Sequence, residues 1–192
     1  FPKVLQLIRD FRETHQTPIV LFTYLNPIYT YGFEKFHTDA AAAGADGVLL
    51  LDLPPDEVQH NKELAAHEGL KHITLIAPTS PDARIEALAR QSEGFIYALS
   101  RTGVTGAQAA PSAAVGATVS KIKQFTDTPV CIGFGINTPE QAQMVGELSD
   151  GVVVGSCIVN QVAENATCEE VAAKVAAFTT PLIQAAKGLQ TV

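Results

Sequence analysis

The sequence has little positive charge and no long apolar run. Its 192 residues include 13 Lys and Arg against 20 Asp and Glu, which gives a net charge of −7. No basic stripe is available to neutralise phosphodiesters, so nucleic acid and anionic membranes are poor candidate partners. No apolar stretch reaches the roughly 18 residues of a membrane span, and we expect no signal peptide. An anionic ligand must therefore be held by local groups.

Cysteine is also scarce. The three cysteines form no Cys-x-x-Cys pair and lie near no spaced histidines, so neither a disulfide framework nor a metal site is indicated. They are Cys131, Cys157 and Cys168. We therefore expect a reduced, cytoplasmic protein. The histidines show no His-Glu-x-x-His pattern and are predicted to be surface residues. They are His15, His37, His60, His67 and His72.

Six apolar runs alternate with helical stretches, and this alternation is typical of a parallel sheet in an α/β protein. The predicted strands are Ile19 to Leu25, Gly47 to Leu53, Ile73 to Ala77, Phe95 to Ser100, Val130 to Phe134 and Gly151 to Gly155. The segment from Gly103 to Ala117 has the weakest period and is predicted to be a mobile loop. No linker is visible, so residues 1–192 are predicted to form a single domain.

A parallel sheet is either open or closed into an eight-unit barrel. A barrel takes about 250 residues, or about 31 for each βα unit, so this chain holds about six units. An open sheet would need no missing material, but no Gly-x-Gly-x-x-Gly follows an early strand. Glycine-rich strand ends instead fall in the last two units, where barrels bind phosphate.

Two of these strand ends run directly into helices. They read Gly133-Phe134-Gly135-Ile136-Asn137 and Val154-Gly155-Ser156-Cys157. Backbone N–H groups at a helix N-terminus bind phosphate, and glycine lets the phosphate approach closely. We expect both ends to present bare N–H groups. The alternative is that the glycines only relieve crowding at tight turns.

The segment Ser100-Arg101-Thr102-Gly103-Val104-Thr105-Gly106 carries a cation, hydroxyls and two glycines. Such a loop can close over a ligand and exclude water, with the Gly106 N–H as a further phosphate donor. The alternative is a surface loop with a solvated arginine.

Three further residues lie near predicted strand ends. Asp52 follows an apolar run, where its carboxylate could orient a substrate hydroxyl or another side chain, or could bond turn N–H groups near Pro54 and Pro55. The hydroxyls of Tyr24 and Tyr97 could reach a ligand, or both rings could be ordinary core aromatics. No paired carboxylates for proton transfer are evident, so the residues indicate binding more than catalysis.

The Ser-Arg-Thr-Gly-Val-Thr-Gly loop, followed by Gly133-Phe134-Gly135-Ile136 and Gly155-Ser156, resembles the tryptophan synthase alpha chain family in motif order and spacing. Leu21-Phe22-Thr23-Tyr24-Leu25-Asn26-Pro27 is similar to that family's third strand and the following loop, and Leu50-Leu51-Asp52-Leu53-Pro54 to its fourth. The resemblance covers essentially all 192 residues.

This resemblance implies a TIM (β/α)8 barrel of the phosphate-binding type, present here as about six βα units. The family cleaves indole-3-glycerol phosphate to indole and glyceraldehyde 3-phosphate. The alpha chain has no cofactor and passes indole to a pyridoxal-phosphate beta chain in an alpha2-beta2 complex.

The resemblance also implies roles for particular residues. Phosphate would be bound by Gly106, Gly135, Gly155 and Ser156. The lid and the substrate contacts would include Arg101, Thr105, Tyr24, Asp52, Tyr97 and Phe134. The beta-chain contact would include Asn26, Pro27 and Tyr29.

The family's two acid-base carboxylates lie upstream of the helix that corresponds to Pro2 to His15, and no residue here replaces them. We therefore expect a C-terminal portion of such an alpha chain, inactive alone. The alternatives are a non-catalytic half-barrel that binds a phosphate ligand or a partner, and another phosphate-binding barrel enzyme. The last of these would need a strand-end lysine or metal-ligand histidines, and neither is evident.

Overall fold

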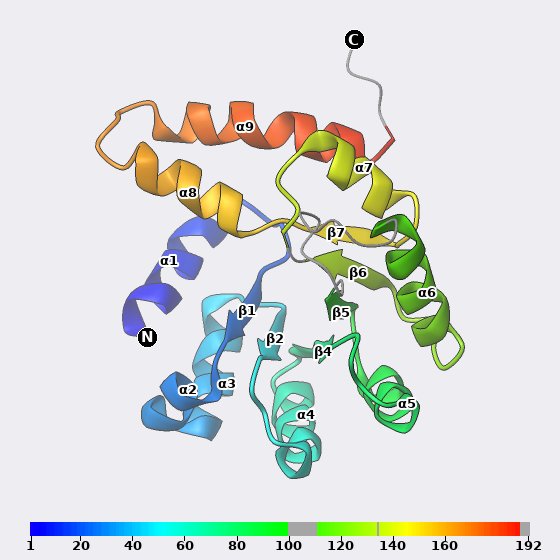
Figure 1. The fold of residues 1–192 in the computed structure, drawn as a ribbon. Helices are drawn as coiled ribbons and strands as arrows, with labels where there is room; N and C mark the ends of the chain where they lie inside the picture. Colours follow the sequence, from blue (N-terminus) through cyan, green and yellow to red (C-terminus); the bar gives the residue numbers. More distant parts are fainter. Residues whose placement is uncertain (100–110, 134, 189–192) are drawn as a thin grey trace. The chain divides into compact units, whose positions relative to one another are not determined.

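The computed structural model describes residues 1–99, 111–133 and 135–188, in which helices alternate with strands (Figure 1). The chain divides into two units, each with its own sheet and its own apolar cluster. The first unit comprises residues 1–75 and 91–94, and the second comprises residues 76–90 and 95 onward. The single domain over residues 1–192 stays a prediction.

The first unit has a three-stranded sheet in the order β1-β2-β3, with all strands parallel. Its elements are α1 (Pro2–Arg12), β1 (Val20–Thr23), α2 (Leu25–Tyr31), α3 (Phe33–Ala43), β2 (Gly47–Leu50), the 3-10 turn η1 (Pro55–Glu57), α4 (Val58–His67) and β3 (Lys71–His72). All four residues of β2 are buried, as expected of a central strand in a parallel sheet. On α3, Phe36, Ala40 and Ala43 recur at helical spacing and join the apolar cluster.

Arg12, the last residue of α1, joins three backbone segments of the first unit. Its Nε donates to the carbonyl oxygen of Gly44 (2.8 Å), and its Nη1 donates to that of Thr17 (2.7 Å). Its Nη2 pairs with Asp46 Oδ2 at 2.5 Å, and the same oxygen accepts the N–H of Ile19 (2.7 Å). These bonds fix the end of α1 against the segments that precede β1 and β2.

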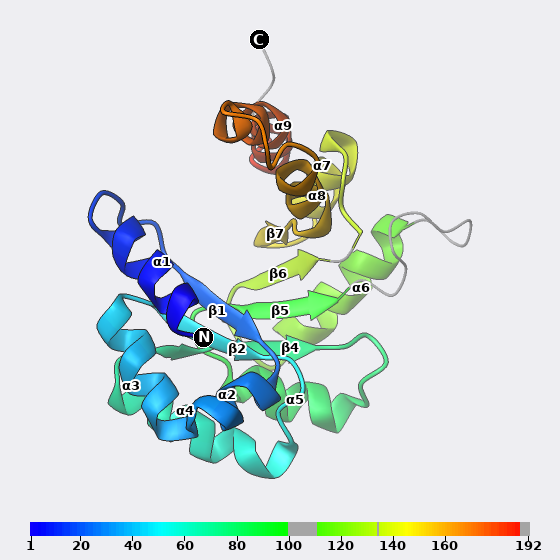
Figure 2. The ribbon, with the colours of Figure 1, turned by 90° about the vertical axis from the view of Figure 1, so that its left-hand side faces the viewer.

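The second unit has a four-stranded sheet in the order β4-β5-β6-β7. Its elements are β4 (Thr74–Ile76), in which the chain passes from the first unit to the second, α5 (Asp82–Gln91), β5 (Ile96–Leu99), α6 (Pro111–Lys123), β6 (Val130–Gly133), α7 (Pro139–Gly146), β7 (Gly151–Val153), α8 (Ser156–Glu164) and α9 (Val171–Ala186). Strands β5, β6 and β7 are parallel (Figure 2). Helix α9 packs beside α7.

The third predicted strand, Ile73 to Ala77, corresponds to β4 (Thr74–Ile76). The short strand β3 (Lys71–His72), which Ile73 separates from β4, was not predicted. β3 pairs with β2, whereas β4 lies beside β5 in the other sheet. The N–H of Ile73 still donates to the Val48 carbonyl oxygen (2.9 Å). The interruption follows from the change of pairing partner, which leaves no mark in side-chain periodicity.

The predicted mobile loop from Gly103 to Ala117 is wrong over its second part. Residues 111–117 form the first two turns of α6, and residues 103–110 lie outside the described residues. Proline suits the first position of a helix, and alanine is the best helix former. Small residues hide the apolar period, although Val115 is buried in the core of the second unit.

Candidate functional site

Asp52 caps helix α2 from the segment that follows β2. Its Oδ1 accepts the N–H of Leu25, the first residue of α2, at 2.7 Å. The N-cap residue Tyr24 is extended and has no side-chain cap bond of its own, so Asp52 satisfies an N–H that would lack an intrahelical partner. The predicted bond to turn N–H groups near Pro54 and Pro55 is therefore replaced by one to Leu25.

Helix α2 has one fully buried side chain, two half-buried side chains at its ends (Leu25 and Tyr31), and exposed side chains between them. Ile28 is fully buried, whereas Asn26, Pro27 and Tyr29 are exposed, with 76% of Tyr29 accessible. Tyr24, directly before the helix, is exposed as well. The residues predicted to contact a partner thus share the outward side of one short helix.

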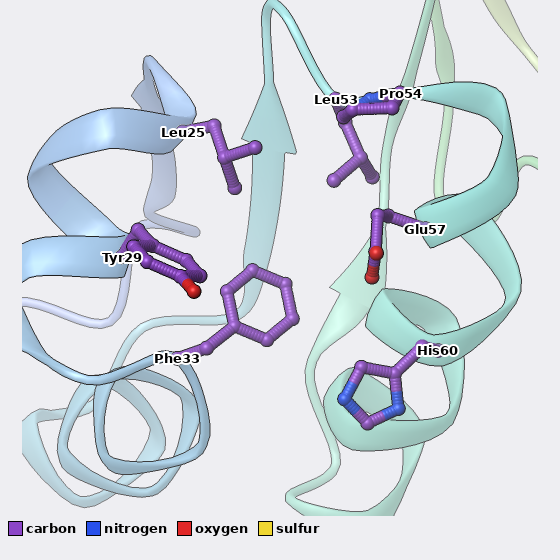
Figure 3. Close-up of a pocket in the computed structure, with 7 residues that line it drawn as sticks. All are labelled: Leu25, Tyr29, Phe33, Leu53, Pro54, Glu57 and His60. Atoms are coloured by element: carbon purple, nitrogen blue, oxygen red, sulfur yellow. The ribbon is translucent and has the colours of Figure 1, made fainter.

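An apolar pocket of about 290 Å³ lies beside this helix in the first unit. Figure 3 shows side chains from α2 and the start of α3 facing side chains from the segment after β2 and from η1 and α4. The lining residues are Leu25, Tyr29, Phe33, Leu53, Pro54, Glu57 and His60. The rings of Phe33 and His60 stack with centroids 5.8 Å apart. Of these residues, only Tyr29 is a predicted site residue, because the pocket depends on how two separate segments face each other.

Two of the five histidines are buried, so the prediction that all are surface residues is wrong. His37 is 0% exposed and His72 is 3% exposed. Both bond to the amide of Asn61, which is buried too. A signal was present: His37 shares the helical stripe of Phe36 and Ala40. His15, His60 and His67 are exposed as predicted.

In the second unit, Tyr97 on β5 is packed against Gly133 at the end of β6. A Cβ on Gly133 would lie 2.6 Å from the Tyr97 hydroxyl oxygen and 2.9 Å from Val153 Cβ. Gly133 therefore relieves crowding, as the alternative interpretation held for this position. Tyr97 is 9% exposed, and burial raises the pKa of its hydroxyl. The ring of Tyr97 therefore packs in the core on the side that faces Gly133.

The start of α8, which follows β7, lacks the crowding found at Gly133. Gly155 is the N-cap of α8, with no side-chain cap bond, and a Cβ there would meet no atom within 4 Å. Crowding does not explain this glycine, and the exposed Ser156 begins the helix beside it. An uncapped helix N-terminus carries backbone N–H groups and positive dipole charge suited to an anion.

The prediction of bare N–H groups before α7 is wrong for Asn137 and Thr138, in the turn that leads into this helix. The side chain of Gln141 accepts the N–H groups of Asn137 (2.9 Å) and Thr138 (3.3 Å), and Thr138 accepts the N–H of Gln141. This capping box occupies donors that were expected to be open. Gly135, two residues earlier, is exposed and has a φ of 74°, which favours glycine.

Several predicted site residues lie outside the described residues. They are Arg101, Thr105, Gly106 and Phe134. Among residues 1–99, 111–133 and 135–188, no group of three or more His, Cys, Asp or Glu side chains is placed to hold a metal ion. In the same part of the chain, no helix is both long and apolar enough to cross a membrane.

A model of one protein family, the tryptophan synthase alpha chain, matches residues 1–187. The chain belongs to this family. A tryptophan synthase alpha chain from Geobacter sulfurreducens is 48% identical over 184 residues, which cover 96% of this chain and 69% of that protein. One from Desulfatibacillum aliphaticivorans is 44% identical over 187 residues, which cover 97% of this chain and 71% of that protein.

Solved structures of the tryptophan synthase family agree with this assignment. The tryptophan synthase A-subunit of Pyrococcus furiosus matches with a TM-score of 0.82 and 32% identity, over 93% of this chain and 71% of that one. Tryptophan synthase from M. tuberculosis matches at 0.81 and 31%, over 97% of this chain and 68% of that one. The chain thus spans about 70% of the length of such relatives. The predicted fold class, an α/β fold of the TIM-barrel type, is confirmed.

Family membership gives the chain a role in tryptophan biosynthesis as part of a lyase that works with a beta chain. It favours this function over the two alternatives that the sequence analysis left open, a non-catalytic half-barrel and another phosphate-binding barrel enzyme.

Proposed function

We propose that the chain supplies the phosphate-binding and partner-facing parts of a tryptophan synthase alpha subunit that cleaves indole-3-glycerol phosphate to indole and glyceraldehyde 3-phosphate. The observation that carries this proposal is the family match over residues 1–187. The partner is a beta chain in an alpha2-beta2 complex. The alpha chain holds no cofactor, and pyridoxal phosphate belongs to the beta chain.

In the second unit, the phosphate is proposed to bind at backbone N–H groups of Gly155 and Ser156, together with those of Gly135 and Gly106. The uncapped start of α8 supports this role. Arg101 and Thr105 are proposed to belong to the closing loop, and Tyr97 and Phe134 to contact substrate. In the first unit, Tyr24 and Asp52 are proposed to contribute on the indole and glycerol side.

The three cysteines Cys131, Cys157 and Cys168 are free thiols, which supports the proposed cytoplasmic location.

A Gly155→Ala substitution tests the phosphate site. The added Cβ meets no atom within 4 Å, and Gly155 has a φ of −132°, so folding should be unaffected. A methyl group beside these N–H groups would keep the phosphate at a distance, so we expect indole-3-glycerol phosphate to bind about tenfold more weakly. Calorimetric titration, with the amide shifts of Ser156 as a second readout, measures this. Equal affinity in both proteins would move the phosphate away from α8.

Catalysis needs a base for the glycerol hydroxyl and an acid for the indole carbon, and these carboxylates are proposed to lie outside residues 1–192. The one carboxylate proposed for the substrate side, that of Asp52, is engaged with the Leu25 N–H. We expect the purified chain to release no indole from indole-3-glycerol phosphate above the uncatalysed rate, with or without a beta chain. Steady indole release by the chain alone would contradict this assignment.

The exposed side of α2 is proposed to contact the beta chain through Asn26, Pro27 and Tyr29. Replacing Tyr29 by Ala removes an exposed aromatic ring, so it should weaken association by about tenfold, the usual cost of losing an interface anchor. Val159→Ala, at an exposed site on α8, is the matched control. Sedimentation of each variant with a beta chain measures the difference, and equal association of both variants would reject this contact.

A further inference from the structure

A chain of hydrogen bonds joins three buried side chains of the first unit: His37 on α3, Asn61 on α4 and His72 on β3. His37 Nε2 lies 2.9 Å from Asn61 Oδ1, and Asn61 Nδ2 lies 2.8 Å from His72 Nδ1. His37 Nδ1 lies 2.9 Å from the carbonyl oxygen of Phe33. We call these three side chains the His-Asn-His triad. It forms a buried polar connection between α3, α4 and β3 in the first unit.

The partners determine which nitrogen carries a proton. The Phe33 carbonyl only accepts, so His37 Nδ1 must be protonated. With Asn61 Oδ1 facing His37, the Nε2 must donate as well, and His37 is then a buried cation. Rotation of the Asn61 amide by half a turn places Nδ2 against His37 Nε2 and Oδ1 against His72 Nδ1. In that arrangement both imidazoles are neutral and every bond is retained.

Counting donors limits how many protons the triad can hold. One extra proton fits, either on His72 Nε2 with the rotated amide, or on His37 Nε2 with Oδ1 facing it. Two extra protons leave both His37 Nε2–H and His72 Nδ1–H pointing at one amide, which has a single acceptor oxygen. One N–H would then face the NH₂ group of Asn61, and two cations would share an apolar site.

Charged groups around the triad do not remove this conflict. From α4 and its end, His60, Lys62 and Glu68 act on the two histidines, and Glu93 acts from the segment after α5. The Glu68 carboxylate is engaged by Thr38 (2.8 Å), and Glu93 lies 3.9 Å from the Lys62 ammonium. Strand β2 contributes no titratable side chain.

We propose that the His-Asn-His triad is an acid-sensitive switch that accommodates one extra proton, in one or the other orientation of the Asn61 amide, and releases α4 from α3 and β3 when a second proton binds. Burial lowers the pKa of His72 to about 4 and also lowers that of His37. Because α4 carries His60 and follows Glu57, its release also dismantles the apolar pocket. The switch does not depend on the proposed lyase function.

The sign of the pH effect follows from these shifts. Unfolded histidines bind protons near pH 6.5, whereas the folded first unit binds them at lower pH. Between pH 6.5 and about 4 the unfolded state therefore holds more protons. We expect the stability of the first unit to be complete above pH 6.5 and to fall on acidification, approaching tenfold in the folding equilibrium per pH unit for each titrating histidine.

Urea unfolding and hydrogen exchange of the first unit between pH 4 and 8 test this switch. Asn61→Asp supplies an oxygen acceptor to each imidazole, so two protons fit and the loss on acidification should be abolished or reversed. His67→Asn, on the exposed side of α4, is the matched control and should keep the wild-type slope. Equal slopes for wild type and Asn61→Asp would overturn the proposal.

A measurement on the unaltered chain is independent of variant folding. Ring-nitrogen NMR at pH 7.5 should show His37 and His72 both protonated at Nδ1 and neutral. On acidification, only one of the two should become doubly protonated while the first unit remains folded. Two doubly protonated rings in a folded first unit would refute the switch.

Discussion

A few polar residues are buried in the part of the chain that the structure describes. One of them is Thr74, whose N–H donates to Ser92 Oγ at 3.2 Å. Its hydroxyl oxygen, however, has no hydrogen-bond partner among the described residues. A buried hydroxyl without a partner costs about 1–3 kcal/mol of stability.

Replacing Thr74 by Val keeps the shape of the side chain and removes the hydroxyl. We expect this change to raise the free energy of unfolding by about 1 kcal/mol, measured by urea denaturation. Thr74→Ser, which keeps the hydroxyl and loses a methyl group, should instead be destabilising. A destabilised Thr74→Val protein would show that the hydroxyl is satisfied in solution.

Some residues could be singled out from their neighbours in the chain. Asn26, Pro27 and Tyr29, predicted to contact a partner, are exposed on α2, and an added Cβ on Gly155, predicted to bind phosphate, would meet no atom within 4 Å. Sequence reasoning missed the bond from Asp52 to Leu25 and the burial of His72, because both depend on segments distant in sequence. The roles of these residues in binding stay predictions.

At the scale of elements, alternating apolar runs predicted the strands well, because buried parallel strands are apolar on both faces. The pattern did not predict that β3 and β4, on either side of Ile73, would belong to different sheets. It also missed the first turns of α6, since small residues carry little periodic signal.

Two helical glycines give opposite expectations for substitution by alanine. A Cβ on Gly116 of α6 would meet only Leu148 Cδ2, at 3.9 Å, so Gly116→Ala should stabilise by about 0.5–1 kcal/mol through helix propensity. A Cβ on Gly146 of α7 would lie 2.5 Å from the backbone oxygen of Ala186, so Gly146→Ala should destabilise by about 1–3 kcal/mol. Thermal unfolding of both variants checks this, and the same sign in both would contradict the close packing of α7 on α9.

At the scale of the whole molecule, the core is divided. One cluster of buried residues belongs to the first unit and another to the second. Ile28 and Ile132 are both fully buried, one in each cluster. Removing one methyl group from either should have a local effect.

Ile28→Val and Ile132→Val form a matched pair, each expected to cost about 0.5–1.5 kcal/mol. Native-state hydrogen exchange should show reduced protection mainly in the unit that carries the substitution, because sub-global opening follows cooperative units. Equal losses across both units for each variant would show that the described residues open as one.

The bonds of Arg12 make this residue a reporter of opening by limited proteolysis. Trypsin must draw an arginine side chain and its flanking backbone into an extended conformation, which would require breaking the bonds to Gly44, Thr17 and Asp46 together. Arg9, three residues earlier, is exposed. Cleavage after Arg9 therefore measures fraying of α1, whereas cleavage after Arg12 measures separation of that helix from the first unit.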